Sequence, residues 1–113
     1  MAKSHVVTWN IEGLRSKWQE LDILRTHFNP IAFCIQDTRL TKDIEKFYHM
    51  TGYKPYFHSI NNRASGVLIY VRNDIPQSEI PLASPLQAVA VRVTVGGKTY
   101  IHLYTSHLLP PQQ

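Results

Sequence analysis

The sequence is poor in the features that mark secreted and membrane proteins. Among its 113 residues there is one cysteine, Cys34, which lies inside an apolar run. A single cysteine forms no disulfide within a chain, so we interpret Cys34 as a small buried hydrophobic residue in a reducing compartment. No apolar run approaches the ~18 residues of a membrane-spanning helix, and Met1–His5 contains no apolar signal segment. We therefore expect an intracellular protein that is neither secreted nor inserted in a membrane.

Acidic residues and metal-binding histidine patterns are also scarce. The chain has 8 acidic residues against 12 Lys and Arg, which gives a formal net charge of +4 and a pI near 9.4. This balance suits a polyanionic partner, although a merely solvated basic surface explains it equally well. None of the six histidines has the H-x-x-x-H spacing of a metal site. With 43% hydrophobic and 18% charged residues, the chain is instead typical of one small globular domain.

Two apolar runs that end in polar residues organise the sequence. The run Val6–Asn10 stops at an amide, and Ile31–Ile35 is followed directly by Gln36 and Asp37. Between them, apolar residues at spacings of three and four predict a helix over Trp18–Phe28. A strand, a helix and a strand with short connections form a βαβ unit, whose two strands are parallel. Asn10 and Asp37 should then emerge at the same edge of the sheet, where an amide and a carboxylate oxygen suit a divalent cation such as magnesium.

The limits of this helix are indicated by its flanking residues. Ser16 and Gln19 have the S-x-x-Q spacing of a capping box, which predicts the beginning of the helix. Pro30 predicts its end, because proline disfavours helical geometry at the residue before it, here Asn29. The apolar stripe includes Ile23 and Phe28, so we expect both to face the sheet.

The second half of the chain has mainly the patterns of β-strands. One short helical face is predicted by Ile44, Phe47 and Tyr48. After it we expect a short strand at Tyr56–His58, a buried strand at Gly66–Val71 and a proline-rich connection or sheet edge at Ile75–Pro85. An alternating strand follows at Gln87–Val95, with its antiparallel partner at Lys98–Tyr104. Gly96 and Gly97 indicate a two-residue hairpin between the last two strands. The sequence thus predicts an α/β (α+β) fold in which one mixed sheet carries a helix on one face and leaves the other face uncovered.

Four of these segments together resemble a known superfamily. They are Trp9-Asn10, Gly13-Leu14-Arg15, Gln36-Asp37-Thr38-Arg39-Leu40 and Gly66-Val67. The combination resembles the first half of the endonuclease/exonuclease/phosphatase superfamily, which includes apurinic endonucleases and pancreatic deoxyribonuclease. The segments from Gly66 to Asn73 and from Leu86 to Val91 are similar to the endonuclease domain of non-LTR (LINE, jockey-type) retrotransposon reverse transcriptase polyproteins. The resemblance implies that residues 1–113 form the N-terminal half of a four-layered α/β-sandwich domain whose second half is missing.

The resemblance also implies roles for individual residues. Asn10 matches the active-site Asn that helps to order the metal and the phosphate, Asp37 stands where the superfamily has the metal-binding Glu of a Gln-Glu-Thr motif, and Tyr104 matches the active-site Tyr that contacts the phosphate. The implied cofactor is Mg²⁺, with Mn²⁺ as a substitute. The strand ends are followed by basic residues that could contact phosphates of DNA or remain solvated loop charges, namely Arg15, Arg39 and Lys42.

The resemblance predicts a fragment of a magnesium-dependent DNA endonuclease, located in the nucleus. The Gly-Asp-x-Asn and Ser-Asp-His motifs of the superfamily's second half are missing from the sequence, so we expect no cleavage by this chain alone. A non-catalytic nucleic-acid-binding module, a domesticated or pseudogene fragment, and a phosphatase of the same superfamily are the alternatives. Because one sheet face should lack a cover, the row Val89, Val91 and Val93 predicts self-association, unless the missing half covers it.

Overall fold

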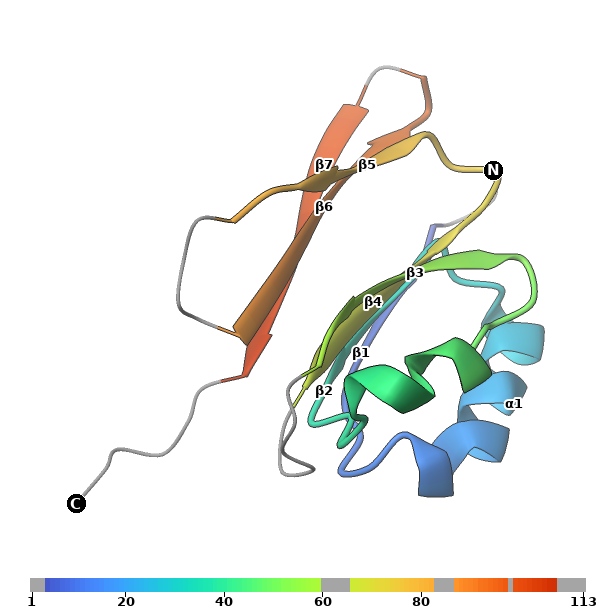
Figure 1. Cartoon of the computed structure of the whole chain (residues 1–113). Helices are drawn as coiled ribbons and strands as arrows, with labels where there is room; N and C mark the ends of the chain where they lie inside the picture. The colour runs from blue at the N-terminus through green and yellow to red at the C-terminus, as the bar shows by residue number, and fades with distance from the viewer. Residues whose placement is uncertain (1–3, 60–65, 83–86, 98, 108–113) are drawn as a thin grey trace.

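The computed structural model describes residues 4–59, 66–82, 87–97 and 99–107 (Figure 1). In chain order the elements are β1 (Val6–Asn10), the 3-10 helix η1 (Arg15–Lys17), α1 (Trp18–Phe28), β2 (Ala32–Gln36), the 3-10 helix η2 (Lys42–Phe47), β3 (Tyr53–His58), β4 (Val67–Arg72), β5 (Gln77–Ile80), β6 (Gln87–Val95) and β7 (Thr99–His107). The strands form two sheets, of order β1-β2-β4-β3 and β5-β6-β7. Among the helices of the described segments, none is long and apolar enough to cross a membrane.

The first sheet begins with the predicted βαβ unit. β1 and β2 are parallel, and their register runs from Val6 opposite Ala32 to Asn10 opposite Gln36. β4 lies antiparallel to both β2 and β3, so the sheet is mixed. Both faces of β2 and β4 are covered, which explains why these two strands are apolar almost throughout.

Helix α1 begins later than the capping box predicts and ends where the proline predicts. The Ser16 hydroxyl donates to the Gly13 carbonyl oxygen at 3.2 Å, and no side chain caps the N-terminus of α1. The predicted capping box is therefore wrong, because the chain makes one turn of 3-10 helix first. At the other end Asn29 adopts the left-handed conformation and its N–H donates to the Arg25 carbonyl oxygen at 2.9 Å, just before Pro30.

The apolar face of α1 is narrower than the sequence predicts. Leu21 is fully buried in an apolar cluster that includes Phe33, Ile35, Leu68 and Tyr70 of the first sheet. Trp18 and Leu24 are partly buried and pack against this cluster. Ile23 and Phe28, however, are 64% and 47% exposed. Ile23 lies about 200° around the helix from Leu21, so the two cannot face the same sheet. Ile44 in η2 and Tyr48 directly after it pack against this cluster, whereas Phe47, which was predicted to share their face, is 69% exposed.

The second sheet covers the face that the sequence analysis leaves open. Figure 1 shows β5, β6 and β7 on the side of the first sheet opposite to α1. The alternating residues Val89, Val91 and Val93 are buried in one cluster with residues of β2 and β4. The predicted self-association through this valine row is therefore wrong, because the chain's own first sheet covers it. The hairpin was also expected to belong to the mixed sheet, but its strands form a sheet of their own.

Two details of the second sheet refine the prediction. The proline-rich segment contributes β5, an edge strand of four residues, as expected for an edge. The hairpin is longer than predicted, because Val95 pairs with Thr99 and leaves residues 96–98 between the strands. Lys98, with which the returning strand was expected to begin, lies outside the described residues.

Candidate functional site

The carboxyl ends of β1 and β2 lie side by side, as the sequence predicts. Beyond the last strand pair, the Ile11 N–H donates to the Gln36 carbonyl oxygen at 3.0 Å and the Gly13 N–H to the Asp37 carbonyl oxygen at 2.9 Å. The two chain segments thus remain hydrogen-bonded after the strands end. We call residues 10–15, 36–42 and Gly66 the rim. The expectation that Asn10 and Asp37 emerge at one edge of the sheet is confirmed.

Gly66 joins β4 to the rim through a very close contact. Its carbonyl oxygen accepts a hydrogen bond from the Thr38 N–H at 3.1 Å. Its φ is +116°, and a Cβ at this position would lie 2.4 Å from the Thr38 Oγ1. Because Thr38 is itself buried, no larger residue fits here without moving the turn that carries Asp37.

The backbone of the rim contains three non-glycine residues in the left-handed region. They are Glu12, Asp37 and Arg39, with φ between 52° and 58°. The fourth such residue among the described positions is Asn29, which caps α1. Left-handed residues other than glycine cost roughly 1–2 kcal/mol each and cluster at functional sites. The rim is therefore a segment whose conformation is set against local preference.

The Asp37 carboxylate is buried and forms an ion pair with Arg39. Its residue is 7% exposed, and its two oxygens accept hydrogen bonds from the Arg39 Nε at 3.2 Å and the Arg39 Nη2 at 3.1 Å. The hydrogen bond to Asp37, with the negative charges of Asp37 and Glu12, raises the pKa of the Arg39 guanidinium above its usual value. Arg39 therefore stays protonated, and the Asp37 carboxylate is held in one orientation.

Two rim residues that the sequence analysis did not select contribute to the site. Glu12 is an exposed acid two residues after Asn10, within electrostatic reach of Arg39. Gln36, the strand partner of Asn10, donates from its Nε2 to the Thr105 Oγ1 of β7 at 2.6 Å. This bond ties the second sheet to the rim. The position of Glu12 in the turn after Asn10 could have indicated it, whereas the Gln36–Thr105 contact spans 69 residues and has no sequence pattern.

The other predicted residues are placed as follows. Asn10 is exposed at the end of β1, and Arg15 and Lys42 are exposed at the beginnings of η1 and η2. Tyr104 lies in β7 opposite Ala90 in β6, and its side chain lies outside the part of the chain that the structure describes. The Lys17 Nζ, which no sequence pattern selected, donates to the Ile11 carbonyl oxygen at 3.0 Å and holds the turn after β1.

The donor atoms of the rim fit a water-rich magnesium site. Mg²⁺ binds through one or two carboxylates and keeps several of its waters. The rim supplies the Asn10 amide, the Glu12 carboxylate and the Asp37 carboxylate, which has about four lone-pair sites and gives two of them to Arg39. Within the described residues no three His, Cys, Asp or Glu side chains gather into a metal cluster, so a magnesium ion held at the rim would take most of its ligands from water.

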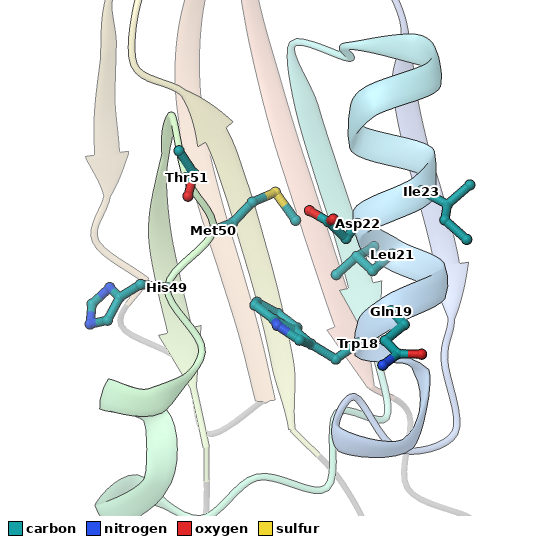
Figure 2. A pocket seen from close by; sticks show the side chains of 8 residues that line it. All are labelled: Trp18, Gln19, Leu21, Asp22, Ile23, His49, Met50 and Thr51. Carbon is teal, nitrogen blue, oxygen red and sulfur yellow. The ribbon is translucent and has the colours of Figure 1, made fainter.

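A separate hollow lies on the helix-covered face of the first sheet. It measures about 430 Å³ and is lined by Trp18, Gln19, Leu21, Asp22, Ile23, His49, Met50 and Thr51. In Figure 2, Trp18, Met50 and Asp22 point into the space between α1 and the chain that enters β3, while Ile23 and His49 point away. Asp22 is paired with Arg25 at 2.8 Å. Because the Asp22 carboxylate is already paired with Arg25 and His49 points away from the space, we take the rim as the candidate site.

Comparisons with known proteins identify the fold. No sequence model of a protein family matches the chain, and no curated protein matches it. Among solved structures, the AP endonuclease of Leishmania major matches 92% of this chain and 40% of its own, with a TM-score of 0.70 and 17% identity. Two structures of one Neisseria protein, NExo, described as a 3'-5' exonuclease and, bound to a product DNA hairpin, as a 3' phosphatase, each match 90% of this chain and 40% of their own, with a TM-score of 0.62 and 20% identity.

These matches show that the chain has the fold of AP endonucleases and related exonucleases and phosphatases. The chain spans about two-fifths of the length of each of the three. One fold here serves three named activities, so the fold by itself does not select one of them. The comparisons with family models, curated proteins and solved structures give no support to the narrower resemblance to retrotransposon endonucleases. That resemblance stays a prediction.

Proposed function

We propose that the chain provides the Asn10 and Asp37 part of a magnesium-dependent phosphodiesterase site that acts on DNA. The observation that carries this proposal is the parallel pairing of β1 and β2, which brings Asn10 and Asp37 to one strained rim. Support comes from the shared fold with an AP endonuclease and with a Neisseria phosphatase bound to DNA. The formal net charge of +4 also suits a polyanionic substrate.

Each proposed residue has a distinct role at the rim. Asn10, Asp37 and Glu12 supply oxygen ligands, and Mg²⁺, when bound, neutralises charge on the phosphoryl oxygens. The side chains of Arg15 and Lys42 are exposed beside the strand ends and contact flanking phosphates. Tyr104 is proposed as a phosphate contact from β7. In this proposal residues 1–113 form a partial domain, and the described residues of the rim do not include the acid–base groups that activate water.

A narrower form of the proposal concerns biological origin. The pattern Trp9-Asn10, Gln36–Leu40 and Gly66-Val67 leads us to propose the endonuclease domain of a non-LTR retrotransposon polyprotein, with a nuclear location. Translating the genomic sequence downstream of the codon for Gln113 tests this proposal. In-frame Gly-Asp-x-Asn and Ser-Asp-His motifs, followed by a reverse transcriptase, would support it, and a stop codon would favour a remnant.

A second candidate is a non-catalytic module that binds nucleic acid. The observation in its favour is the Asp37–Arg39 ion pair, because both carboxylate oxygens already accept hydrogen bonds from the guanidinium. A phosphatase with the same fold is a further alternative. The structure of the rim does not distinguish a phosphodiester from a terminal phosphate, so the substrate must be established by experiment.

The test compares DNA binding with and without magnesium. Fluorescence anisotropy of a labelled duplex should show tighter binding in Mg²⁺ than in EDTA, and Asn10→Ala should remove that difference. Asn73→Ala is the matched control, because Asn73 is also an exposed asparagine but follows β4 at the far end of the sheet. Equal binding in Mg²⁺ and EDTA for all three proteins would contradict the proposed cation site.

The same samples test whether the chain is catalytically complete. We expect supercoiled plasmid to remain intact with the pure protein and Mg²⁺, because losing general acid–base groups lowers rates by several orders of magnitude. Magnesium-dependent nicking that disappears with Asn10→Ala would show instead that this chain contains a whole active site. Nicking that persists with Asn10→Ala would indicate a contaminating nuclease.

A further inference from the structure

The Asp37–Arg39 ion pair is built into the backbone of one tight turn. The two residues are separated by only one position, and both are held in the left-handed region, with φ of 56° and 58°. The turn is fixed on both sides, because the Asp37 carbonyl oxygen accepts from the Gly13 N–H and the Thr38 N–H donates to Gly66. The pairing is therefore prepared by the fold and does not depend on a chance encounter of two flexible side chains.

The two partners differ in their freedom to move. The Asp37 side chain is 10% exposed, whereas the Arg39 side chain is 49% exposed. The Arg39 stem passes close to Gly13, since a Cβ on Gly13 would lie 3.8 Å from the Arg39 Cδ. The guanidinium can thus turn towards solvent while the carboxylate stays in place. Arg39 is therefore the partner that solvent and external ligands reach first.

Each partner, when paired, is less available to an external ligand of opposite charge. The guanidinium bonds use one lone pair on each oxygen of Asp37 and place a positive charge where a metal ion would bind. The Nε and Nη2 donors that face Asp37 are the edge with which arginine binds phosphate in a two-bond geometry. A cation competes with Arg39 for Asp37, and a phosphate competes with Asp37 for Arg39.

We propose that Arg39 is exchanged between Asp37 and a substrate phosphate, so that phosphate binding at the rim releases Asp37 for the metal ion. This inference rests on the proposed function, and it adds that the metal and the phosphate bind cooperatively. Arg39 is a phosphate ligand in the complex and a positioning residue for Asp37 in the free protein. The site would then bind a lone metal ion weakly and reach its full cation affinity only with nucleic acid in place.

Removing either partner should uncover the binding capacity of the other. Asp37→Asn keeps a residue that tolerates the left-handed conformation and frees Arg39, so inorganic phosphate should bind about tenfold more tightly than to the wild type. Arg39→Gln frees Asp37, so Mn²⁺ alone should bind about tenfold more tightly. Isothermal titration calorimetry of the full chain, with each probe in a separate titration, measures both affinities. The Mn²⁺ affinity of Arg39→Lys should lie between those of Arg39→Gln and the wild type.

Matched variants separate this exchange from a general effect of net charge. Lys46→Gln lowers the charge by the same amount as Arg39→Gln at an exposed position near the end of η2, outside the rim, and should leave the Mn²⁺ affinity within about twofold. Glu20→Gln raises the charge as Asp37→Asn does, from an exposed position on α1, and should leave the phosphate affinity equally unchanged. Far-UV circular dichroism and a urea midpoint confirm that each variant folds.

The outcomes distinguish the exchange from the proposed function. If Mn²⁺ and phosphate bind to the wild type and Asn10→Ala weakens Mn²⁺, but Asp37→Asn and Arg39→Gln produce no gain, the exchange is overturned and the cation site remains. If no variant binds Mn²⁺ or phosphate, both the exchange and the proposed function are overturned. Equal gains with Arg39→Gln and Lys46→Gln would also overturn the exchange, because net charge would explain them.

Discussion

The interface between the two sheets and the rim at their edge are built from the same strands in opposite ways. Between the sheets, Val91 and Val93 of β6 pack against Ile69 and Val71 of β4 in one apolar cluster. At the rim, residues that follow β1 and β2 adopt left-handed conformations, and a buried carboxylate is paired with an arginine. Apolar packing at the interface therefore stabilises the fold. This packing offsets the free-energy cost of holding the polar groups of the rim in an unfavourable but fixed arrangement.

This contrast predicts where substitutions are costly and for what reason. In the apolar clusters the loss in free energy of unfolding should increase with the side-chain volume removed, because packing is the dominant contribution. At the rim this loss should depend on backbone geometry and on individual hydrogen bonds, so that small changes in side-chain size matter as much as large ones.

The largest effect should come from the apolar cluster under α1. Phe33 is fully buried there and packs edge-on against Tyr53, with ring centroids 5.5 Å apart. Phe33→Ala should lower the free energy of unfolding by about 3–5 kcal/mol, through lost burial and a residual cavity. Phe47→Ala is the control, because it removes the same type of side chain at a position that is 69% exposed. It should change the free energy of unfolding by less than about 0.5 kcal/mol. Urea unfolding of both variants checks the difference, and similar losses would contradict the assigned packing.

The next effect should come from the rim glycine. Gly66→Ala places a Cβ 2.4 Å from the Thr38 Oγ1 at a φ of +116°, which should cost about 2–3 kcal/mol. Gly52→Ala is the control, because Gly52 also has a positive φ, of +84°, but a Cβ there meets nothing within 4 Å. That variant should lose only about 1 kcal/mol, from the left-handed backbone alone. Equal losses in urea unfolding would show that the Gly66–Thr38 contact is not tight.

A smaller effect should come from the hydrogen bond that joins the second sheet to the rim. The Gln36 Nε2 donates to the buried Thr105 Oγ1 at 2.6 Å, and more weakly to the Thr8 Oγ1 and the Cys34 carbonyl oxygen within the first sheet. Gln36→Leu and Thr105→Val each remove the bond between the sheets. A double-mutant cycle in urea should give a coupling energy of about 1 kcal/mol. Additive losses would mean that the two sheets are held together at the rim by apolar packing alone.

The smallest effect at neutral pH concerns Cys34, in the cluster between the sheets. Burial raises the pKa of its thiol from 9.0 to about 11, so the folded state binds the proton more tightly than the unfolded state. This contribution to stability is complete below pH 9 and is lost as the pH rises from 9 to 11. A thiol reagent at pH 8 should label Cys34 only in urea, and the urea midpoint of Cys34→Ala should vary less than that of the wild type between pH 8 and 10. Rapid labelling of the folded protein would contradict the burial.

The same contrast explains which features the sequence could predict. The βαβ unit and the common edge of Asn10 and Asp37 follow from apolar runs of strand length and from the handedness of the crossover. Alternation in Gln87–Val95 correctly placed Val89, Val91 and Val93 on one face, but alternation does not say what covers a face. The sequence therefore did not show that the chain's own strands cover this row, and self-association or a cover from the missing half was predicted in their place.

The details of the rim could not be predicted, because they oppose local preferences. Aspartate tolerates the left-handed region but does not require it, and arginine has no preference for it; at Asp37 and Arg39 the turn is held by the hydrogen bonds from Gly13 and to Gly66. For the same reason the sequence suggested Asp37 as an open metal ligand and Arg39 as a separate phosphate contact. The structure shows that the two side chains form an ion pair with each other.

The central claim is that the rim carrying Asn10 and Asp37 binds a divalent cation, and paramagnetic broadening by Mn²⁺ tests it most directly. In ¹⁵N–¹H spectra of the labelled full chain, with a short DNA duplex present, substoichiometric Mn²⁺ should selectively broaden the amides of Asn10–Gly13 and Asp37–Arg39. The amides of Asn29 and Asn73, at the other end of the first sheet, should remain sharp. Broadening centred on any other part of the protein, or uniform broadening along the whole chain, would contradict the account.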